Sequence, residues 1–137
     1  MEQTVMQEQA QPGAGLARPH FGAMLGYEHL ESPEGTAILE LKLKQEHCNL
    51  HGSVHGGVLL SLVDAAGLWA NAPKDGTIPA AATASVNCNF LRGARFGKVE
   101  SLRAESRVDK RGRAVFFSTI SVYAHPDRKS TRLNSSH

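Results

Sequence analysis

The stretch that decides the fold is residues 49–72, which read NLHGSVHGGVLLSLVDAAGLWANA. Residues 54–72 are apolar on nearly every side, which is typical of a helix that other elements surround. Gly56 and Gly57 stand at the start of this apolar run and leave backbone N–H groups bare. Because the start of a helix carries a partial positive charge, such N–H groups stabilise an oxyanion or a polarised carbonyl. The stretch therefore predicts a central helix whose first turn can bind a polarised oxygen.

Asp64 is a carboxylate within this otherwise apolar helix. It follows Gly57 by seven residues, close to two full turns, so both residues lie on one stripe of the helix. A carboxylate on an apolar helix is costly unless a pocket solvates it or a partner pairs with it. Oxyanion donors beside a carboxylate are what hydrolysis or acyl transfer requires. A structural carboxylate that bonds a neighbouring strand is the alternative, and the spacing alone leaves both open.

Alternating side chains predict a sheet on either side of this helix. Strands are expected over residues 36–44, 83–91, 99–108 and 114–124, with a hairpin turn at 109–112. A short helix is expected from Phe21 and should end near Gly26. An antiparallel sheet curled around one apolar helix satisfies all of these faces, so we predict an α+β domain.

Composition narrows the class of protein. The chain has 137 residues, of which 41% are hydrophobic and 20% charged, as in a single soluble globular domain. The whole formal net charge of +2 comes from residues 127–137, and a neutral remainder argues against a nucleic-acid partner. The longest apolar stretch falls short of the roughly 20 residues of a membrane span, so no membrane association is expected. Two cysteines form no disulfide framework, and no signal peptide is recognisable, so we expect a cytoplasmic protein.

Both ends of the chain differ from the middle. Residues 1–19 are rich in Gln and lack an apolar period, so we expect a disordered tail. Residues 127–137, DRKSTRLNSSH, resemble the in-frame translation of a common sequencing adapter, although a natural polar C-terminus would have a similar composition. We therefore expect a C-terminally truncated domain over residues 20–126. The tail has Leu133 as its one aliphatic residue and should form no strand.

The segment Asn49 to Asp64, with His55-Gly56-Gly57 inside it, resembles the signature of hotdog-fold acyl-CoA thioesterases of the PaaI-like type. The resemblance covers residues 21–126 and includes the strand SVNCNFLR at 85–92. It implies a hotdog fold and hydrolysis of an acyl-CoA to a carboxylic acid and coenzyme A, with no cofactor and no metal. The family pattern has a further strand beyond Ala124, so the sheet is expected to lack its last strand and to expose an edge.

The resemblance also implies a role for each matching residue. Asp64 matches the carboxylate that acts as general base for water or as nucleophile, and the Gly56 N–H matches the group that polarises the thioester carbonyl. Asn49 and His55 match positions that hold the loop and the thioester region, and Ser85 matches a hydroxyl that places the water or the carboxylate. In this family Asp64 faces the partner subunit's loop, which implies a homodimer or homotetramer. The helix is apolar on more sides than one small sheet can cover, which also predicts at least a dimer.

Coenzyme A should bind through residues near this motif. Planar guanidinium groups suit its phosphates, and we favour Arg92 and Arg113, with Gly57 and Gly112 as further substrate-binding positions. Two alternatives stay open at this point. One is a hotdog protein that binds acyl-CoA without hydrolysing it. The other is another hotdog enzyme such as a dehydratase, against which the position of Asp64 argues.

Three other groups have simpler explanations. His47, His51 and His55 are spaced by four with Cys48 beside them, a pattern that could hold a metal ion. The intervening glycines break the helix that this spacing needs, so we expect no metal. The two cysteines are expected to be small buried residues and Trp69 to belong to the core.

Overall fold

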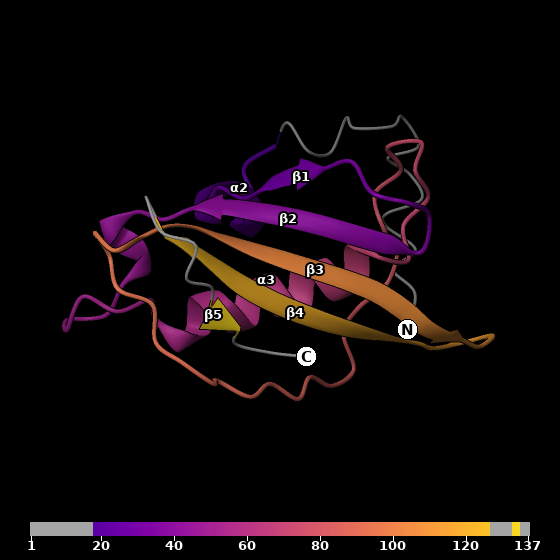
Figure 1. Cartoon of the computed structure of the whole chain (residues 1–137). Coiled ribbons are helices and arrows are strands. Elements are labelled where there is room, and N and C mark those ends of the chain that lie inside the picture. The colour runs from indigo at the N-terminus through magenta and orange to yellow at the C-terminus, as the bar shows by residue number, and fades with distance from the viewer. Residues whose placement is uncertain (1–17, 127–132, 135–137) are drawn as a thin grey trace.

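The structure, a computed structural model, describes residues 18–126 and 133–134 and consists of one curved sheet around one long helix (Figure 1). The sheet is antiparallel throughout, in the order β1-β2-β3-β4-β5. Its strands are β1 (Glu28–Leu30), β2 (Thr36–Lys42), β3 (Val99–Arg111), β4 (Phe116–Pro126) and β5 (Leu133–Asn134). The helices are α2 (Phe21–Leu25), the 3-10 turn η2 (Gln45–His47) and α3 (Gly56–Trp69). The predicted hotdog arrangement, a sheet wrapped around a central helix, is confirmed.

The core lies between α3 and the concave face of the sheet. Inward side chains of three neighbouring strands stand in register, with Ala104 paired to Leu39 on one side and to Val122 on the other. All three are buried, and Leu62 of α3 is fully buried as well. Because successive strand residues point to opposite faces, these positions alternate with solvent-facing ones along each strand. The small side chain of Ala104 leaves room for the helix to approach the middle of the sheet.

Two serines of the sheet fix the position of α3. The buried Ser106 hydroxyl donates to the carbonyl of Ala66 at 2.6 Å, and Ser118 donates to the carbonyl of Gly67 at 3.0 Å. A Cβ at Gly67 would lie 3.3 Å from Ile120 Cδ1, so the missing side chain allows this close approach. The last turns of α3, which follow Asp64, are therefore held against β3 and β4.

The helix and the hairpin differ in extent from the prediction. α3 begins at Gly56, because the His55 ring caps it by accepting a hydrogen bond from the Gly57 N–H. β3 continues through residues 109–111, which were expected in the turn, with a register shift between Val108 and Lys110. The turn comes later and closes with a hydrogen bond from the Gly112 N–H to the Val115 carbonyl. Sequence alternation also missed β1, which has only three residues.

The predicted strand over residues 83–91 is not a strand in the structure. This segment runs beside α3 as extended chain (Figure 1). Its backbone makes no hydrogen bond to another described residue. Alternation predicts an extended conformation with two distinct faces, but a strand also requires a neighbouring backbone to pair with. No other strand of the described sheet supplies that partner.

The expectation that residues 127–137 form no strand was wrong. β5 pairs with β4 through Tyr123 opposite Asn134 and Ala124 opposite Leu133. Pairing at a sheet edge requires only backbone N–H and carbonyl groups, so two residues can add to the edge without an inward apolar face. The rest of that tail, residues 127–132 and 135–137, lies outside the described residues, as does most of the N-terminal tail predicted over residues 1–19.

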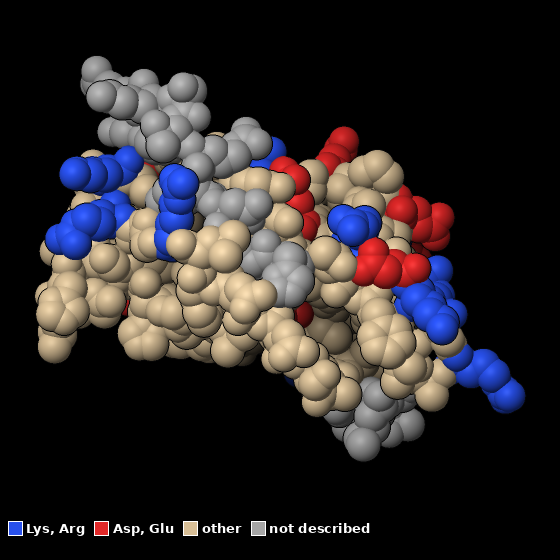
Figure 2. All heavy atoms as spheres, turned by 60° about the horizontal axis from the view of Figure 1, so that its bottom comes forward, with Lys and Arg blue, Asp and Glu red and all other residues tan. Residues whose placement is uncertain are grey.

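One broad face carries few charges. Figure 2 shows uncharged atoms across the middle of this face, with charged side chains gathered toward both ends. Exposed large apolar residues lie on the segment between α3 and β3, namely Phe90, Leu91 and Phe96, and on α3 at Leu60. No helix in the described part of the chain is long and apolar enough to cross a membrane.

Candidate active site

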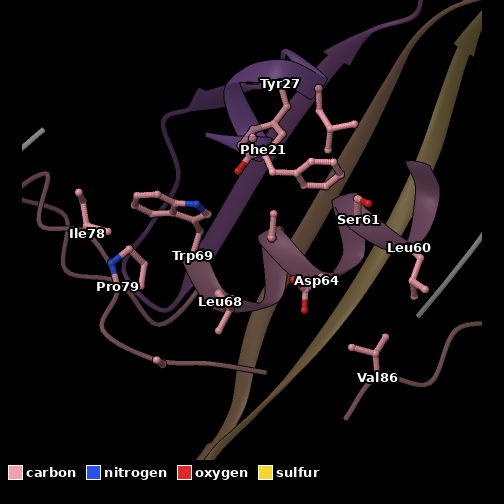
Figure 3. A pocket seen from close by; sticks show the side chains of 14 residues that line it. Phe21, Tyr27, Leu60, Ser61, Asp64, Leu68, Trp69, Ile78, Pro79 and Val86 are labelled. Atoms are coloured by element: carbon pink, nitrogen blue, oxygen red, sulfur yellow. The ribbon is translucent and has the colours of Figure 1, made fainter. Parts of the chain in front are cut away.

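Asp64 lies in the wall of an open cavity of about 510 Å³ (Figure 3). One face of α3 lines it, because Leu60, Asp64 and Leu68 recur every four residues. Aromatic side chains close another side, from Phe21 of α2, Tyr27 and Trp69. The remaining lining residues are Gly22, Leu25, Ser61, Ala65, Ile78, Pro79, Ala81 and Val86. Asp64 thus presents a half-buried carboxylate to a largely apolar space.

A threonine holds the carboxylate of Asp64. The Thr83 hydroxyl donates a hydrogen bond to Oδ1 of Asp64. Sequence reasoning placed Ser85 in this role, but the structure leaves Ser85 exposed and brings Thr83 to Asp64 instead. Both residues occupy the same face of the alternating segment, so the pattern identified the face but not the position along α3. A Thr83 side chain in this contact can orient the carboxylate or a water beside it.

The first turn of α3 offers a free backbone donor. His55 Nδ1 accepts from the Gly57 N–H at 2.8 Å, which satisfies that donor. The Gly56 N–H makes no hydrogen bond within the described residues, and Gly56 is exposed. A Cβ at Gly56 would stand 3.7 Å from the Phe90 ring, an ordinary contact. The Gly56 N–H is therefore free to donate to another group, and its role on a carbonyl stays a prediction.

The loop before α3 is built around Asn49. Its Oδ1 accepts from the His51 N–H at 2.9 Å and from the Ser53 N–H at 3.1 Å. Arg95 supports the loop from outside by donating to the His51 carbonyl at 2.9 Å. Gly52 has a φ of +83°, a conformation that few other residues adopt, so the turn depends on a glycine here. Asn49 and His55 thus shape the loop and the helix start, respectively.

Gly56 and Asp64 of one chain stand too far apart to act on one carbonyl group. They are eight residues apart in a continuous helix, which places them about 12 Å apart along its axis. A thioester carbonyl bonded to one N–H must lie within about 3 Å of that donor. A carbonyl bonded to the Gly56 N–H is therefore out of reach of Asp64 of the same chain.

The predicted coenzyme A residues are not together in one chain. Arg92 is exposed and lies three residues before Arg95, whose side chain donates to the Asn49 loop. Gly112 and Arg113 lie in the turn that follows β3. Because β3 has 13 residues, this turn is roughly 40 Å from the end of the sheet where β3 begins. Arg95, which sequence reasoning did not single out, lies nearer to the start of α3.

The contacts of His47 and of the two cysteines indicate structural roles for these residues. His47 is buried and uses both ring nitrogens, since Nδ1 accepts from the Lys44 N–H at 2.9 Å and Nε2 donates to the Leu25 carbonyl at 2.8 Å. Burial raises the pKa of the thiols of Cys48 and Cys88, so both are protonated and poorly nucleophilic at neutral pH. No group of three or more potential ligands is positioned for a metal ion among the residues that the structure describes.

Tyr27 adds a polar group to the aromatic side of the cavity. Burial raises the pKa of its hydroxyl, a hydrogen bond with Trp69 opposes this, and the negative charge of Asp64 adds to it. Tyr27 therefore remains neutral at neutral pH. Its ring also meets the edge of His29, at 5.6 Å between centroids.

A known protein family matches more than half of the chain. The model of the thioesterase superfamily matches residues 51–131, which include the start of α3 and Asp64. The chain belongs to the thioesterase superfamily. This thioesterase-superfamily chain is 28% identical over 104 residues to human acyl-coenzyme A thioesterase 13, a match that covers 75% of this chain and 72% of that protein. It is 29% identical over 87 residues to a Pseudomonas aeruginosa protein named as an esterase, and the match spans 63% of that protein's length.

Solved structures of the superfamily share the fold. Zebrafish thioesterase superfamily member 2 superposes with a TM-score of 0.70 at 24% identity, covering 98% of this chain and 95% of that chain. The PaaI protein of E. coli, from the phenylacetic acid degradation operon, gives a TM-score of 0.69 at 24% identity, covering 96% and 89%. The predicted resemblance to PaaI-like hotdog proteins is confirmed.

Proposed function

We propose that this protein is an acyl-CoA thioesterase, which hydrolyses a thioester to a free carboxylic acid and coenzyme A. The observation that carries the proposal is the Asp64 carboxylate, set in an apolar cavity and oriented by Thr83. The similarity to human acyl-coenzyme A thioesterase 13 supports the substrate class. The apolar and aromatic lining supports an acyl group as the part of the substrate that enters.

In the proposed reaction, Asp64 either removes a proton from a water that attacks the thioester carbonyl or attacks the carbonyl itself. The Gly56 N–H donates to the carbonyl oxygen as negative charge develops on it. The C–S bond then breaks, and the departing thiolate of coenzyme A takes up the proton that Asp64 removed from water, or a proton from solvent if Asp64 attacked directly. If Asp64 attacks first, water then hydrolyses the anhydride so formed and restores the carboxylate. Protein groups and water suffice, so we propose no cofactor.

We propose that the working unit is a homodimer, alone or within a tetramer. The 12 Å helical separation of Gly56 and Asp64 supports a site that combines Asp64 of one chain with the loop of the other. The unpaired backbone over residues 83–91 and the exposed side chains of Phe90 and Leu91 support the same association. Arg92 and Arg95, close to the loop, are the basic residues we propose for the phosphates of coenzyme A.

The test is an assay with a panel of short, medium, long and aromatic acyl-CoA substrates, with free thiol as the readout. We expect the wild-type protein to release coenzyme A. Asp64→Asn should lower kcat by a hundredfold or more, since loss of a general base or nucleophile costs about 3 kcal/mol of transition-state stabilisation. Asp64→Asn should also keep the wild-type melting temperature. A folded wild-type protein that binds acyl-CoA without turnover would instead indicate a binding protein.

A further inference from the structure

A second cavity borders Trp69 and is not lined by Asp64. It has a volume of about 750 Å³ and is open to solvent. Its apolar walls come from Leu30 of β1, Ala37 of β2, and Ala72 and Pro73 after α3. Trp69 is the one residue of the described chain that lines both this cavity and the cavity of Asp64. The indole thus stands as a partition between two spaces that could accept apolar groups.

The partition lies on the path an acyl group would follow. Asp64 and Trp69 are five residues apart in α3, about 7.5 Å along the helix axis. Both line the first cavity, but from different sides of α3, because five residues turn the chain by about 140° around the helix axis (Figure 3). An acyl group with its carbonyl at Asp64 would therefore reach the indole only where it fills the cavity around this side of the helix.

The indole is held in place from two sides. The His29 ring meets it edge-on at 4.3 Å between centroids, and the Tyr27 side chain shares a hydrogen bond with it. Both partners belong to β1 or to the residue before it, and β1 is paired to β2. Moving the indole would therefore break contacts with two aromatic side chains.

Beyond the indole, the second cavity can take a chain but ends in polar groups. Lys74 lies at this end and donates to the Thr36 carbonyl and to the Ser32 hydroxyl. Glu31 adds a second charge to the lining. The part suited to methylene groups is thus the part formed by Leu30, Ala37, Ala72 and Pro73.

On the basis of the thioesterase function proposed above, we propose that Trp69 sets the length of the acyl group by closing the cavity of Asp64 against the second cavity. The wild-type enzyme should favour short or compact acyl groups. Removing the indole should join the two cavities and extend the preference toward longer linear chains. Each methylene that becomes buried should then raise kcat/KM by about fourfold until the second cavity is filled.

The experiment compares kcat/KM across linear acyl-CoA substrates of increasing length for wild type, Trp69→Ala and Trp69→Phe. We expect the optimum to move to longer chains in Trp69→Ala, mainly through KM, and to stay near the wild-type length in Trp69→Phe. Leu68→Ala is the matched control, because Leu68 lines only the first cavity and its removal opens no path to the second. Adding Leu30→Trp to Trp69→Ala should refill the second cavity and return the optimum toward shorter chains.

Folding is checked by thermal unfolding, and Trp69→Leu replaces Trp69→Ala if the latter does not fold. Leu30→Trp alone is a further test, with Trp69 intact. If Trp69 closes off the second cavity, filling that cavity should not change the preferred acyl length. A profile that is the same in folded wild type and Trp69→Ala, or one that shifts equally in Leu68→Ala, would overturn the role of Trp69 while leaving the thioesterase function intact. A wild-type protein inactive on every acyl-CoA would instead overturn the proposed function.

Discussion

The Thr83 hydroxyl donates a hydrogen bond to Oδ1 of Asp64, and this contact joins the segment after α3 to the helix that carries the carboxylate. The two residues are 19 positions apart, and no other hydrogen bond or ion pair to the Asp64 side chain is seen among the described residues. Orientation of the carboxylate therefore depends on a single hydroxyl.

Thr83→Val keeps the shape of the side chain and removes that hydroxyl. A hydrogen bond to a charged group contributes about 1.5–3 kcal/mol, so we expect kcat to fall roughly ten- to hundredfold. Thr83→Ser retains the hydroxyl and should restore most of the activity. Steady-state kinetics on one good acyl-CoA substrate distinguish the variants. A loss in Thr83→Ser with activity retained in Thr83→Val would show that the methyl group, rather than the hydroxyl, matters.

Gly56→Pro tests the backbone donor at the start of α3. Proline is well tolerated at the first position of a helix, and His55 before it already has an extended backbone, with φ −65° and ψ 134°. The substitution therefore removes the N–H with little effect on the helix. We expect kcat to fall about a hundred- to a thousandfold, as for loss of one oxyanion donor. Gly56→Ala keeps the N–H and serves as the control, with much of the wild-type activity.

Mixing the Asp64→Asn and Gly56→Pro variants tests whether two chains share each site. If Asp64 of one chain works with Gly56 of the other, a dimer of one Asp64→Asn chain and one Gly56→Pro chain contains one intact site. Random exchange at a one-to-one ratio should then restore about a quarter of the wild-type activity. Activity that stays at the level of the separate variants, with subunit exchange verified by mass spectrometry, would place both groups of a site in one chain.

His29 predicts a pH dependence of stability. Burial lowers the pKa of its ring, and the charge of Lys74 lowers it further. The unfolded chain then binds a proton near the ordinary value of about 6.5, above the pKa of the folded state. Its contribution to stability is full above that pH and is lost as the pH falls toward the lowered pKa. Melting temperatures from about pH 7.5 to about 5.5 should fall more for wild type than for His29→Phe, which keeps a ring against Trp69.

His47 is predicted to matter for folding rather than for chemistry. Its ring bonds both the Lys44 N–H and the Leu25 carbonyl while buried, and so connects α2 to the loop after β2. His47→Ala would leave two polar backbone groups without partners and should lower the free energy of unfolding by about 2–4 kcal/mol. His51→Ala, at an exposed position in the same loop, should change it by less than about 0.5 kcal/mol. Denaturant titration of both variants checks the difference.

Most of the fold could be predicted from patterns that extend over many residues. The apolar run of α3 and the alternation of β2, β3 and β4 depend on burial, which the sequence records directly. The two-residue pairing of β5 and the unpaired segment 83–91 could not be predicted, because pairing depends on which backbone lies alongside.

For the candidate site, the sequence pointed to individual residues but not to the contacts between them. Asp64 and Gly56 stand out because a carboxylate and a glycine pair are unusual in an apolar helix. Thr83 was missed in favour of Ser85 because a period of two fixes the face of an extended segment and leaves its register along α3 open. The sequence also did not point to a partition at Trp69, since an aromatic residue at the end of a helix is usually part of the core. The role we propose for it rests on the two cavities that it lines.

The dimer proposed above would make turnover depend on protein concentration through the extended segment that follows α3. Thr83 is the first residue of this segment, residues 83–91, and the backbone amides of the segment have no hydrogen-bond partner in the described chain. In a separated subunit those amides should exchange with solvent deuterium as fast as in an unstructured peptide, and Thr83 would be held on Asp64 by one hydrogen bond. Association of a second copy would protect the amides and steady the hydroxyl together. Dilution should therefore lower activity per chain and amide protection over residues 83–91 along the same curve, with the midpoint at the dissociation constant of the dimer.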